Sequence, residues 1–213
     1  MKPFYWCVRG TVKLFVELFY GHKVYGTSHI QSGRAIIAPN HASFLDPPII
    51  SASWPIEISF LARKSLFSTF LIGWSIKRLN AYPVDGTNHD ITSIKLICKL
   101  LNEDHQVVIF PSGVRSFDGK LDEIKSGVCM LALRCHAPII PVYIYGSFDV
   151  WDRTRRFPKL RGKTACVIGS PVSWEPYAQM DKKEGQEAMR QKVAEAIEGL
   201  QEWYEKGAIG APP

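Results

Sequence analysis

The sequence lacks a disulfide pattern, a linker and any segment of low complexity. Its five cysteines are odd in number and scattered, and no two of them form a Cys-x-x-Cys pair. This usage argues against a disulfide framework and a zinc site, and it fits a reducing compartment. No repeat or shift in composition divides the 213 residues, of which 46% are hydrophobic. We therefore expect one domain with a substantial core.

The apolar N-terminal segment, residues 1–20, lacks the features of a secretory signal and of a membrane span. It has no small-residue cleavage site, and it is too short and too charged for a span, which needs roughly 20 mostly apolar residues. A helix lying in the lipid headgroup region would suit its aromatic and basic side chains, Tyr5, Trp6, Tyr20, Lys2, Arg9 and Lys13. The alternative is a helix packed on the protein core. The apolar positions spread wider than one stripe, which favours the membrane surface.

Acidic residues are the minority among the charged ones. The chain has 20 Asp and Glu against 26 Lys and Arg, a formal net charge of +6 at pH 7. A basic surplus suits an anionic partner, whether nucleic acid, anionic lipid or a phosphorylated substrate. No nucleic-acid-binding motif supports the first of these.

Apolar runs and turn residues predict strands and helices that alternate along the chain. The expected strands are residues 22–30, 35–38, 56–61, 82–84, 107–110, 139–144 and 165–168. The expected helices, besides the N-terminal one, are residues 49–53, 66–79, 91–101, 127–135 and 181–204. This alternation predicts a single layered α/β domain, with a mostly parallel mixed sheet flanked by helices.

One imidazole and one carboxylate, His41 and Asp46, follow the expected strand 35–38 where the chain turns. A carboxylate that holds an imidazole fixes its tautomer and stabilises the imidazolium, which is the arrangement of a general base. A separation of five residues is not the spacing of one helix face. A turn must therefore carry His41, and the first turn of the next segment must carry Asp46. The alternative is a helix start at which Asp46 is a capping residue and His41 is solvated.

Two further turns are expected to join this one, because functional groups gather at the carboxyl ends of parallel strands. One turn offers Gly113 for a tight backbone, Ser112 and backbone N–H groups for hydrogen bonds, and Arg115 for an anion. The planar fork of arginine donates two parallel hydrogen bonds to phosphate. The other turn carries Arg63 and Lys64. The alternatives are a surface salt bridge for Arg115 and a solvated sheet edge for Arg63 and Lys64.

Taken together, these blocks resemble the glycerolipid acyltransferase family. Residues 40–46 match the family's first motif, Asn-His-x-Ser-x-x-Asp, at all four fixed positions. Residues 110–116 match five of seven positions of its third motif, Phe-Pro-Glu-Gly-Thr-Arg-Ser. Residues 60–67 and 137–142 are similar to other blocks of the family, in the same order. The resemblance covers about residues 22–172.

The resemblance implies roles for the residues of these turns. His41 would be the general base that removes the proton of an acceptor hydroxyl, and Asp46 would orient it. Arg115 would bind the acceptor's phosphate, and Ser112, Gly113, Arg63 and Lys64 would complete the substrate site. Backbone amides near Ser112 and Gly113 or near His41 would stabilise the oxyanion of the transition state.

The implied reaction is the transfer of a fatty acyl group from an acyl thioester to 1-acyl-sn-glycerol 3-phosphate, which forms phosphatidic acid. The thioester would be acyl-CoA or acylated acyl carrier protein, and no metal or other cofactor is expected. The expected partners are these substrates and a membrane surface at its cytoplasmic face, with no nucleic acid. Residues 1–20 would form a membrane-interface helix, residues 21–206 the acyltransferase domain and residues 207–213 a frayed tail.

Two departures from the family pattern leave the acceptor open. Ser112 stands where the third motif has Glu, and Gly86 stands where the second motif, Gly-x-x-Phe-Ile-x-Arg, ends in Arg. A substitute for that arginine could be any of several cations, namely Arg63, Lys64, Lys77, Arg78 or Lys125. The alternatives are therefore acylation of glycerol 3-phosphate or of another lysophospholipid, or a lipid-binding module without catalysis.

Overall fold

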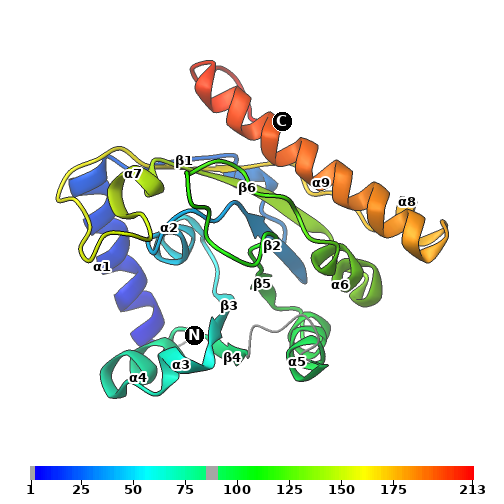
Figure 1. Cartoon of the computed structure of the whole chain (residues 1–213), viewed down its shortest axis with the longest axis horizontal. Helices are drawn as coiled ribbons and strands as arrows, with labels where there is room; N and C mark the ends of the chain where they lie inside the picture. Colours follow the sequence, from blue (N-terminus) through cyan, green and yellow to red (C-terminus); the bar gives the residue numbers. More distant parts are fainter. Residues whose placement is uncertain (1–2, 85–90) are drawn as a thin grey trace.

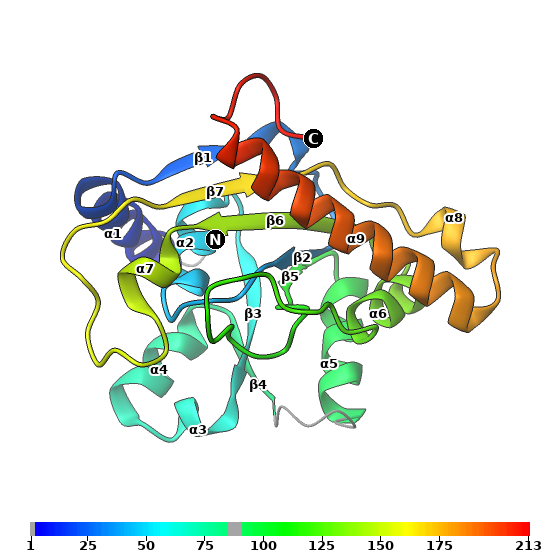
Figure 2. The same ribbon diagram turned by 45° about the horizontal axis from the view of Figure 1, so that its top comes forward.

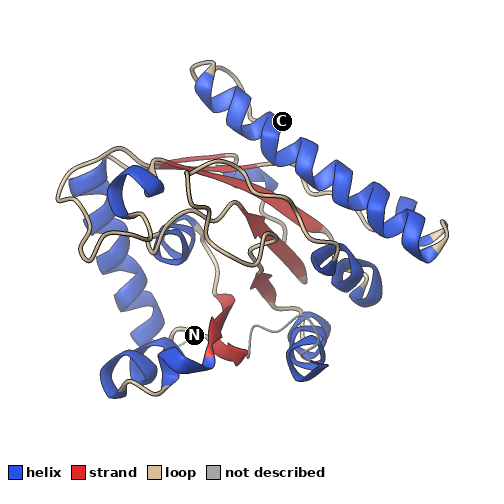
Figure 3. Cartoon of the chain, viewed as in Figure 1, coloured by secondary structure: helices blue, strands red, loops and turns tan. Residues whose placement is uncertain are grey.

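The protein is an α/β domain in which a seven-stranded sheet lies between helices, as a computed structural model describes for residues 3–84 and 91–213 (Figures 1 and 3). The strands follow the spatial order β1 (Lys23–Tyr25), β7 (Ala165–Ile168), β6 (Ile139–Tyr145), β2 (Ala35–Pro39), β5 (Gln106–Val108), β3 (Ile58–Arg63) and β4 (Ala81–Val84). All neighbouring strands are parallel except β6 and β7. The predicted fold class is confirmed.

Two hydrophobic cores lie on opposite faces of the sheet, because successive side chains of a strand point to opposite sides. On β2, Ile36 packs with residues of α5 (Ile91–Asn102), α6 (Gly127–Cys135) and α9 (Lys182–Glu205). Its neighbour Ile37 packs instead with residues of α1 (Pro3–Tyr20) and α2 (Asp46–Ser53). This central strand is buried on both faces, as continuous apolar runs in parallel sheets are.

Several expected elements have different bounds. The expected strand 22–30 is only β1, because Gly26 turns the chain at a φ of 74° against the carbonyl of Ile168, where no Cβ would fit. The short 3₁₀ helix η1 (Thr27–His29) follows. Two short helices were not predicted, α7 (Ser147–Trp151) and α8 (Glu175–Ala178).

The prediction of one continuous helix over residues 66–79 was wrong. The chain forms α3 (Lys64–Phe67) and α4 (Phe70–Arg78), separated by Thr69 in an extended conformation. The end of α3 lies close to α4, since a Cβ on Gly73 would come within 2.4 Å of the Phe67 carbonyl oxygen. Gly73 therefore permits the two helices to meet at this corner.

Helix α1 packs against the sheet over one face and is exposed over another. Tyr5 and Tyr20, expected at a lipid headgroup, are fully buried. The Arg9 guanidinium donates to the Trp54 carbonyl at the end of α2 at 2.7 Å, and the Trp6 indole donates to Glu57 at 3.1 Å. Tyr5 and Tyr20 are therefore core residues, which corrects the expectation that they face lipid, whereas Trp6 and Arg9 bond to protein but are half-exposed. Lys2 lies outside the described residues. No helix of the described residues is long and apolar enough to cross a membrane.

The segment expected to be a frayed tail, residues 207–213, is non-helical and returns to the body of the domain. The Trp203 indole donates to the Ile209 carbonyl at 3.1 Å, and the Ser170 amide donates to the Pro213 carbonyl at 3.0 Å. These contacts hold the segment beside the start of the loop after β7.

The carboxyl ends of β2, β3, β5 and β6 lie at one edge of the sheet, because these strands are parallel to one another (Figure 2). The turns after them therefore meet in space, although they are far apart in sequence. They include residues 40–46, 63–64 and 111–116, the three turns singled out from the sequence, and α7 after β6.

Candidate functional site

His41 and Asp46 lie together at this edge. His41 Nδ1 is 2.7 Å from Asp46 Oδ2, and the side chains are 16% and 1% exposed. A carboxylate only accepts hydrogen bonds, so Nδ1 carries the proton and the Nε2 lone pair is free to take another. Asp46 is the first residue of α2 and makes no capping hydrogen bond to that helix. The alternative of a helix cap with a solvated imidazole is therefore wrong.

The turn is built around the Asp46 carboxylate, which explains the spacing of five residues. Besides the imidazole, Asp46 Oδ2 accepts from the backbone amides of Ala42 at 2.7 Å and Ser43 at 2.8 Å. Three donors on one buried oxygen fix the carboxylate and, through it, the orientation of the His41 ring.

The other fixed residues of the motif attach the turn to neighbouring elements. The Asn40 side chain accepts from the Ile144 amide at 2.7 Å and donates to the Ile144 carbonyl at 3.1 Å, which binds the turn to β6. The Ser43 hydroxyl donates to the Trp151 carbonyl at the end of α7 at 2.6 Å. Each polar residue of the motif thus has a separate structural contact.

The turn after β5 contacts the His41 turn directly. The Phe110 ring stacks on the His41 ring, with centroids 3.8 Å apart, and the Ser116 amide donates to the His41 carbonyl at 2.8 Å. The imidazole is therefore held by a carboxylate at one nitrogen and by an aromatic ring over its face.

Arg115 lies on the same edge and presents an unused hydrogen-bond donor. Its guanidinium carbon is 3.6 Å from the centroid of the Phe44 ring, within the His41 turn. Its buried Nη1 has no acceptor among the described residues. A buried guanidinium nitrogen without an acceptor is costly unless a ligand completes it. The alternative given for Arg115, a surface salt bridge, is not formed within the described chain.

Two other arginines add positive charge beside Arg115. Burial lowers the pKa of Arg115, the guanidinium groups of Arg153 and Arg63 lower it further, and Asp46 opposes the shift. Arg153 also donates to the Arg115 carbonyl at 3.2 Å and stacks on Phe117. Three like charges gathered in this way favour an anion such as phosphate.

Sequence reasoning missed Arg153, which follows α7 in a loop with no family motif. The available signal was the run of basic residues directly after a short element at the end of β6. Arg63 is close enough to Arg115 to lower the pKa of Arg115, which places it in the same group of positive charges. Lys64 is exposed at the start of α3, and Gly86 lies outside the described residues.

Ser112 and Gly113 shape the turn. The Ser112 hydroxyl donates to the Val114 carbonyl at 2.8 Å, and Gly113 has a φ of 75°, a conformation that favours glycine. A Cβ at Gly113 would come within 3.3 Å of Lys125 Nζ, so that ammonium group flanks the turn. Of the other possible cations, Arg78 stacks on Trp74 of α4.

Three of the amides in the turns expected to stabilise an oxyanion already have acceptors. The Gly113 amide donates to the Phe110 carbonyl at 3.0 Å, and the Ala42 and Ser43 amides donate to Asp46. These three N–H groups are therefore structural donors in this conformation.

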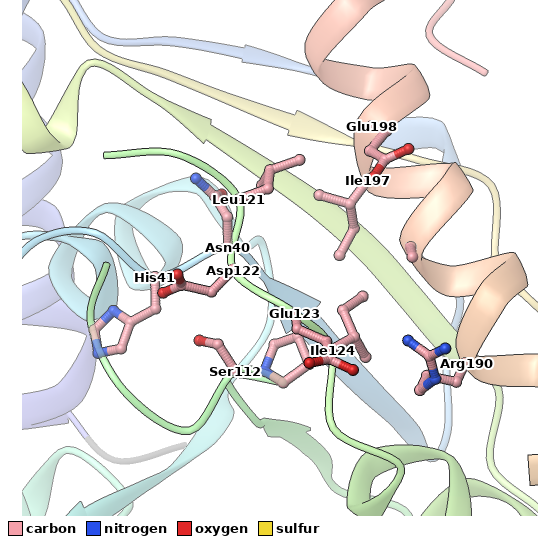
Figure 4. A pocket seen from close by; sticks show the side chains of 12 residues that line it. Asn40, His41, Ser112, Leu121, Asp122, Glu123, Ile124, Arg190, Ile197 and Glu198 are labelled. Atoms are coloured by element: carbon pink, nitrogen blue, oxygen red, sulfur yellow. The ribbon is translucent and has the colours of Figure 1, made fainter. Parts of the chain in front are cut away.

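A pocket of about 220 Å³ opens beside His41, between α9 and the turns at the carboxyl ends of the parallel strands (Figure 4). Its lining includes Asn40, His41 and Ser112. The rest of it comes from the loop before α6 and from α9, namely Pro111, Leu121, Asp122, Glu123, Ile124, Arg190, Ala194, Ile197 and Glu198. Three carboxylates against one guanidinium disfavour a phosphate here. The positive charge of the site lies instead on the Arg115 side. Across residues 3–84 and 91–213, no three His, Cys, Asp or Glu side chains group as a metal site would require.

The chain is similar to known acyltransferases in sequence and in fold. The family model described as acyltransferase matches residues 21–145. The 1-acyl-sn-glycerol-3-phosphate acyltransferase of Bacillus subtilis (strain 168) is 30% identical over 192 residues, which cover 89% of this chain and 93% of that protein. The enzyme of that name from Streptococcus pneumoniae is 27% identical, over 94% and 74% of the two chains. The crystal structure of the 1-acyl-sn-glycerophosphate acyltransferase PlsC of Thermotoga maritima superposes with a TM-score of 0.74 at 25% identity, covering 92% and 81%.

Proposed function

The chain belongs to the acyltransferase family, and on that premise we propose that it acylates the free hydroxyl of 1-acyl-sn-glycerol 3-phosphate and so forms phosphatidic acid. Its relatives from Bacillus subtilis and Streptococcus pneumoniae carry the name of this activity, which supports the acceptor. The observation that carries the proposal is the 2.7 Å contact between His41 Nδ1 and the buried Asp46 carboxylate, which leaves Nε2 free.

In the proposed mechanism the acceptor hydroxyl approaches His41 Nε2. The imidazole takes the hydroxyl proton while the oxygen attacks the carbonyl carbon of the thioester, and Asp46 stabilises the imidazolium. The tetrahedral intermediate then collapses. The C–S bond breaks, the imidazolium returns its proton to the sulfur, and a free thiol and an ester result. General-base catalysis of this kind contributes about 10²–10⁴-fold to the rate.

The acceptor's phosphate would bind on the Arg115 side of His41. The unpartnered Nη1 of Arg115 and the nearby charges of Arg63 and Arg153 support this orientation. The carboxylate-lined pocket on the other side of the turns disfavours the phosphate. Phosphate position and base position together would select the hydroxyl that reacts.

The acyl donor is a thioester of coenzyme A or of acyl carrier protein. The enzyme acts at the cytoplasmic face of a membrane, where the acceptor is anchored by its acyl chain. The exposed apolar side chains of α1, Leu14, Phe15, Leu18 and Phe19, support a membrane-surface position. Ser112 in place of a family glutamate is the reason to test other acceptors beside this one.

The test is thiol release from acyl-CoA or from acylated acyl carrier protein, with lysophosphatidic acid or glycerol 3-phosphate as acceptor. The wild-type chain should release thiol with lysophosphatidic acid, and His41→Ala should lose that release. Equal and slow release by both proteins would overturn the enzymatic role of His41. Release with glycerol 3-phosphate alone would overturn the acceptor.

A further inference from the structure

The loop between α7 and β7, residues 152–163, concentrates positive charge. It contains six Lys and Arg against one Asp, a net charge of +5 in a chain whose whole net charge is +6. The carboxylate, Asp152, pairs with Arg155 at 2.7 Å. The remaining cations beyond Arg153 are Arg156, Lys159, Arg161 and Lys163, all exposed and without a carboxylate partner in the described part of the chain.

Two large apolar side chains stand among these cations. Phe157 is 70% exposed and Leu160 is 77% exposed, and each has a basic residue on at least one side. Exposed apolar groups interleaved with cations are the chemistry of a segment that meets an anionic lipid surface, with the rings and methyl groups entering the headgroup boundary. We call residues 152–163 the basic loop.

The basic loop lies beside the end of α1, as both views of the ribbon show (Figures 1 and 2). The Tyr20 hydroxyl donates to the Lys159 carbonyl at 3.0 Å, and the Thr164 amide donates to the Tyr20 carbonyl at 3.1 Å. The same end of α1 carries Leu18, which is 71% exposed. Hydrogen bonds therefore hold the basic loop beside the end of α1, and both segments expose apolar side chains on this side of the molecule.

The basic loop and the end of α7 also contact the turns that carry Arg115 and His41. Arg153 donates to the Arg115 carbonyl at 3.2 Å, and the Trp151 carbonyl accepts from Ser43 of the His41 turn at 2.6 Å. A surface that held the loop would therefore lie close to the mouth of the site.

We propose that the basic loop is a second membrane-docking element, which binds the headgroups of anionic lipids through its four unpaired cations and inserts Phe157 and Leu160. The partner is a lipid surface rather than an acidic protein, because the loop offers apolar groups for insertion and continues into the exposed face of α1. A single weak membrane-binding element gives only marginal attachment, whereas two elements, such as the exposed face of α1 and the basic loop, together give stable attachment. The docking does not depend on acyl transfer.

The experiment is sedimentation of the full chain with vesicles of phosphatidylcholine, with or without phosphatidylglycerol. The loop variant combines Arg156→Gln, Lys159→Gln, Arg161→Gln and Lys163→Gln. A control variant of the same net charge combines Lys182→Gln, Lys183→Gln, Lys192→Gln and Lys206→Gln, all exposed and on or next to α9. A cation near an anionic surface is worth about fivefold in binding, so the loop variant should lose about 100-fold or more of its partitioning into phosphatidylglycerol vesicles. The control variant should bind like the wild type, and added salt should weaken wild-type binding.

A second variant tests insertion with the charges intact. Phe157→Ser combined with Leu160→Ser should weaken vesicle binding by about tenfold or more, because two large apolar groups are lost. If this variant binds like the wild type, the loop does not insert and the proposal fails. Equal losses in the loop variant and the α9 control would overturn it too, since only net charge would then matter.

Two further measurements separate this proposal from the proposed activity. His41→Ala should sediment like the wild type, and the loop variant should release thiol like the wild type with a short-chain acceptor free of vesicles. A loop variant that sediments normally but fails only with an acyl carrier protein donor would assign the loop to an acidic protein and overturn lipid docking.

Discussion

At the scale of single residues, the first motif is a folding unit as well as the proposed catalytic pair. One oxygen of Asp46 accepts from His41, Ala42 and Ser43, so the turn closes around a buried carboxylate. Asn40 attaches that turn to β6. A spacing that looks arbitrary in the sequence is therefore the length of chain needed to wrap one carboxylate.

Asp46→Asn tests this dual role. The oxygen of the asparagine amide can take the place of Oδ2, which accepts three hydrogen bonds, but it carries no negative charge to stabilise the His41 imidazolium. We expect kcat for thiol release to fall by about 10²–10⁴-fold while the fold is retained. Steady-state kinetics measures the fall, and circular dichroism checks the fold. A folded variant with wild-type kcat would show that Asp46 only shapes the turn.

Arg153 offers a second prediction at this scale, because it lies beside Arg115 and has no counterpart among the sequence motifs. A hydrogen bond to a charged group is worth about 1.5–3 kcal/mol. Arg153→Ala should therefore raise KM for lysophosphatidic acid by about tenfold or more and leave KM for the thioester unchanged. The matched control is Arg34→Ala, whose guanidinium pairs with Asp104 at the surface. Equal effects of both substitutions on acceptor KM would exclude a local role for Arg153.

At the scale of elements, one buried histidine connects three of them. His22, between α1 and β1, lies 2.9 Å from the Thr164 hydroxyl before β7 and 2.9 Å from the Ser53 hydroxyl of α2. Burial lowers the pKa of His22 to about 4, and Lys13 contributes to the same shift. The folded protein therefore holds this imidazole neutral, and the unfolded chain protonates it near pH 6.5.

The sign of the pH effect follows from this difference. Between pH 6.5 and 4 the unfolded chain binds a proton at His22 that the folded chain does not, so the free energy of unfolding decreases as the pH falls through that window. The loss attributable to this pKa shift is about 3 kcal/mol at its full extent. Urea unfolding of the wild type and His22→Gln at several pH values should show the stability gap between them narrowing as the pH falls from 7 to 4. A constant gap would contradict the pKa shift.

The local sequence pattern predicted most of the helices and strands but not the positions at which they end. Buried strands such as β2 and the amphipathic α9 follow directly from apolar runs and helical periodicity. The break between α3 and α4 depends on a close approach at Gly73, and the early end of β1 depends on the Ile168 carbonyl. Such tertiary contacts have no signature within the segment itself, and they decided the bounds.

At the scale of the whole molecule, the strand order assembles the site. Because β2, β3, β5 and β6 are parallel, the rule for strand ends was enough to predict that the three motif-bearing turns meet. The rule could not predict that the loop after α7 reaches Arg115, since this requires the path of the chain after β6. Arg153 was missed for that reason.

Helix α1 shows why the two alternatives for the N-terminus could not be separated by sequence. The helix has one face packed in the core, with Tyr5, Val16 and Tyr20, and another face that is apolar and exposed, with Leu14 and Leu18. An apolar pattern wider than one stripe is what such a helix requires. Deleting residues 1–20 would therefore open the core, and loss of vesicle binding in that truncation would be uninformative.

Substitutions confined to the exposed face of α1 give a cleaner test. Leu14 and Leu18 are 58% and 71% exposed, so Leu14→Gln combined with Leu18→Gln should change the free energy of unfolding by no more than about 1 kcal/mol. If α1 lies in the headgroup region, loss of two leucines should weaken sedimentation with phosphatidylcholine vesicles by about tenfold or more. The matched control, Met180→Gln with Ile209→Gln, removes exposed apolar groups beside α9 and should leave sedimentation unchanged. Equal sedimentation of all three proteins would mean that this face of α1 does not meet lipid, and the membrane position would then depend on the basic loop alone.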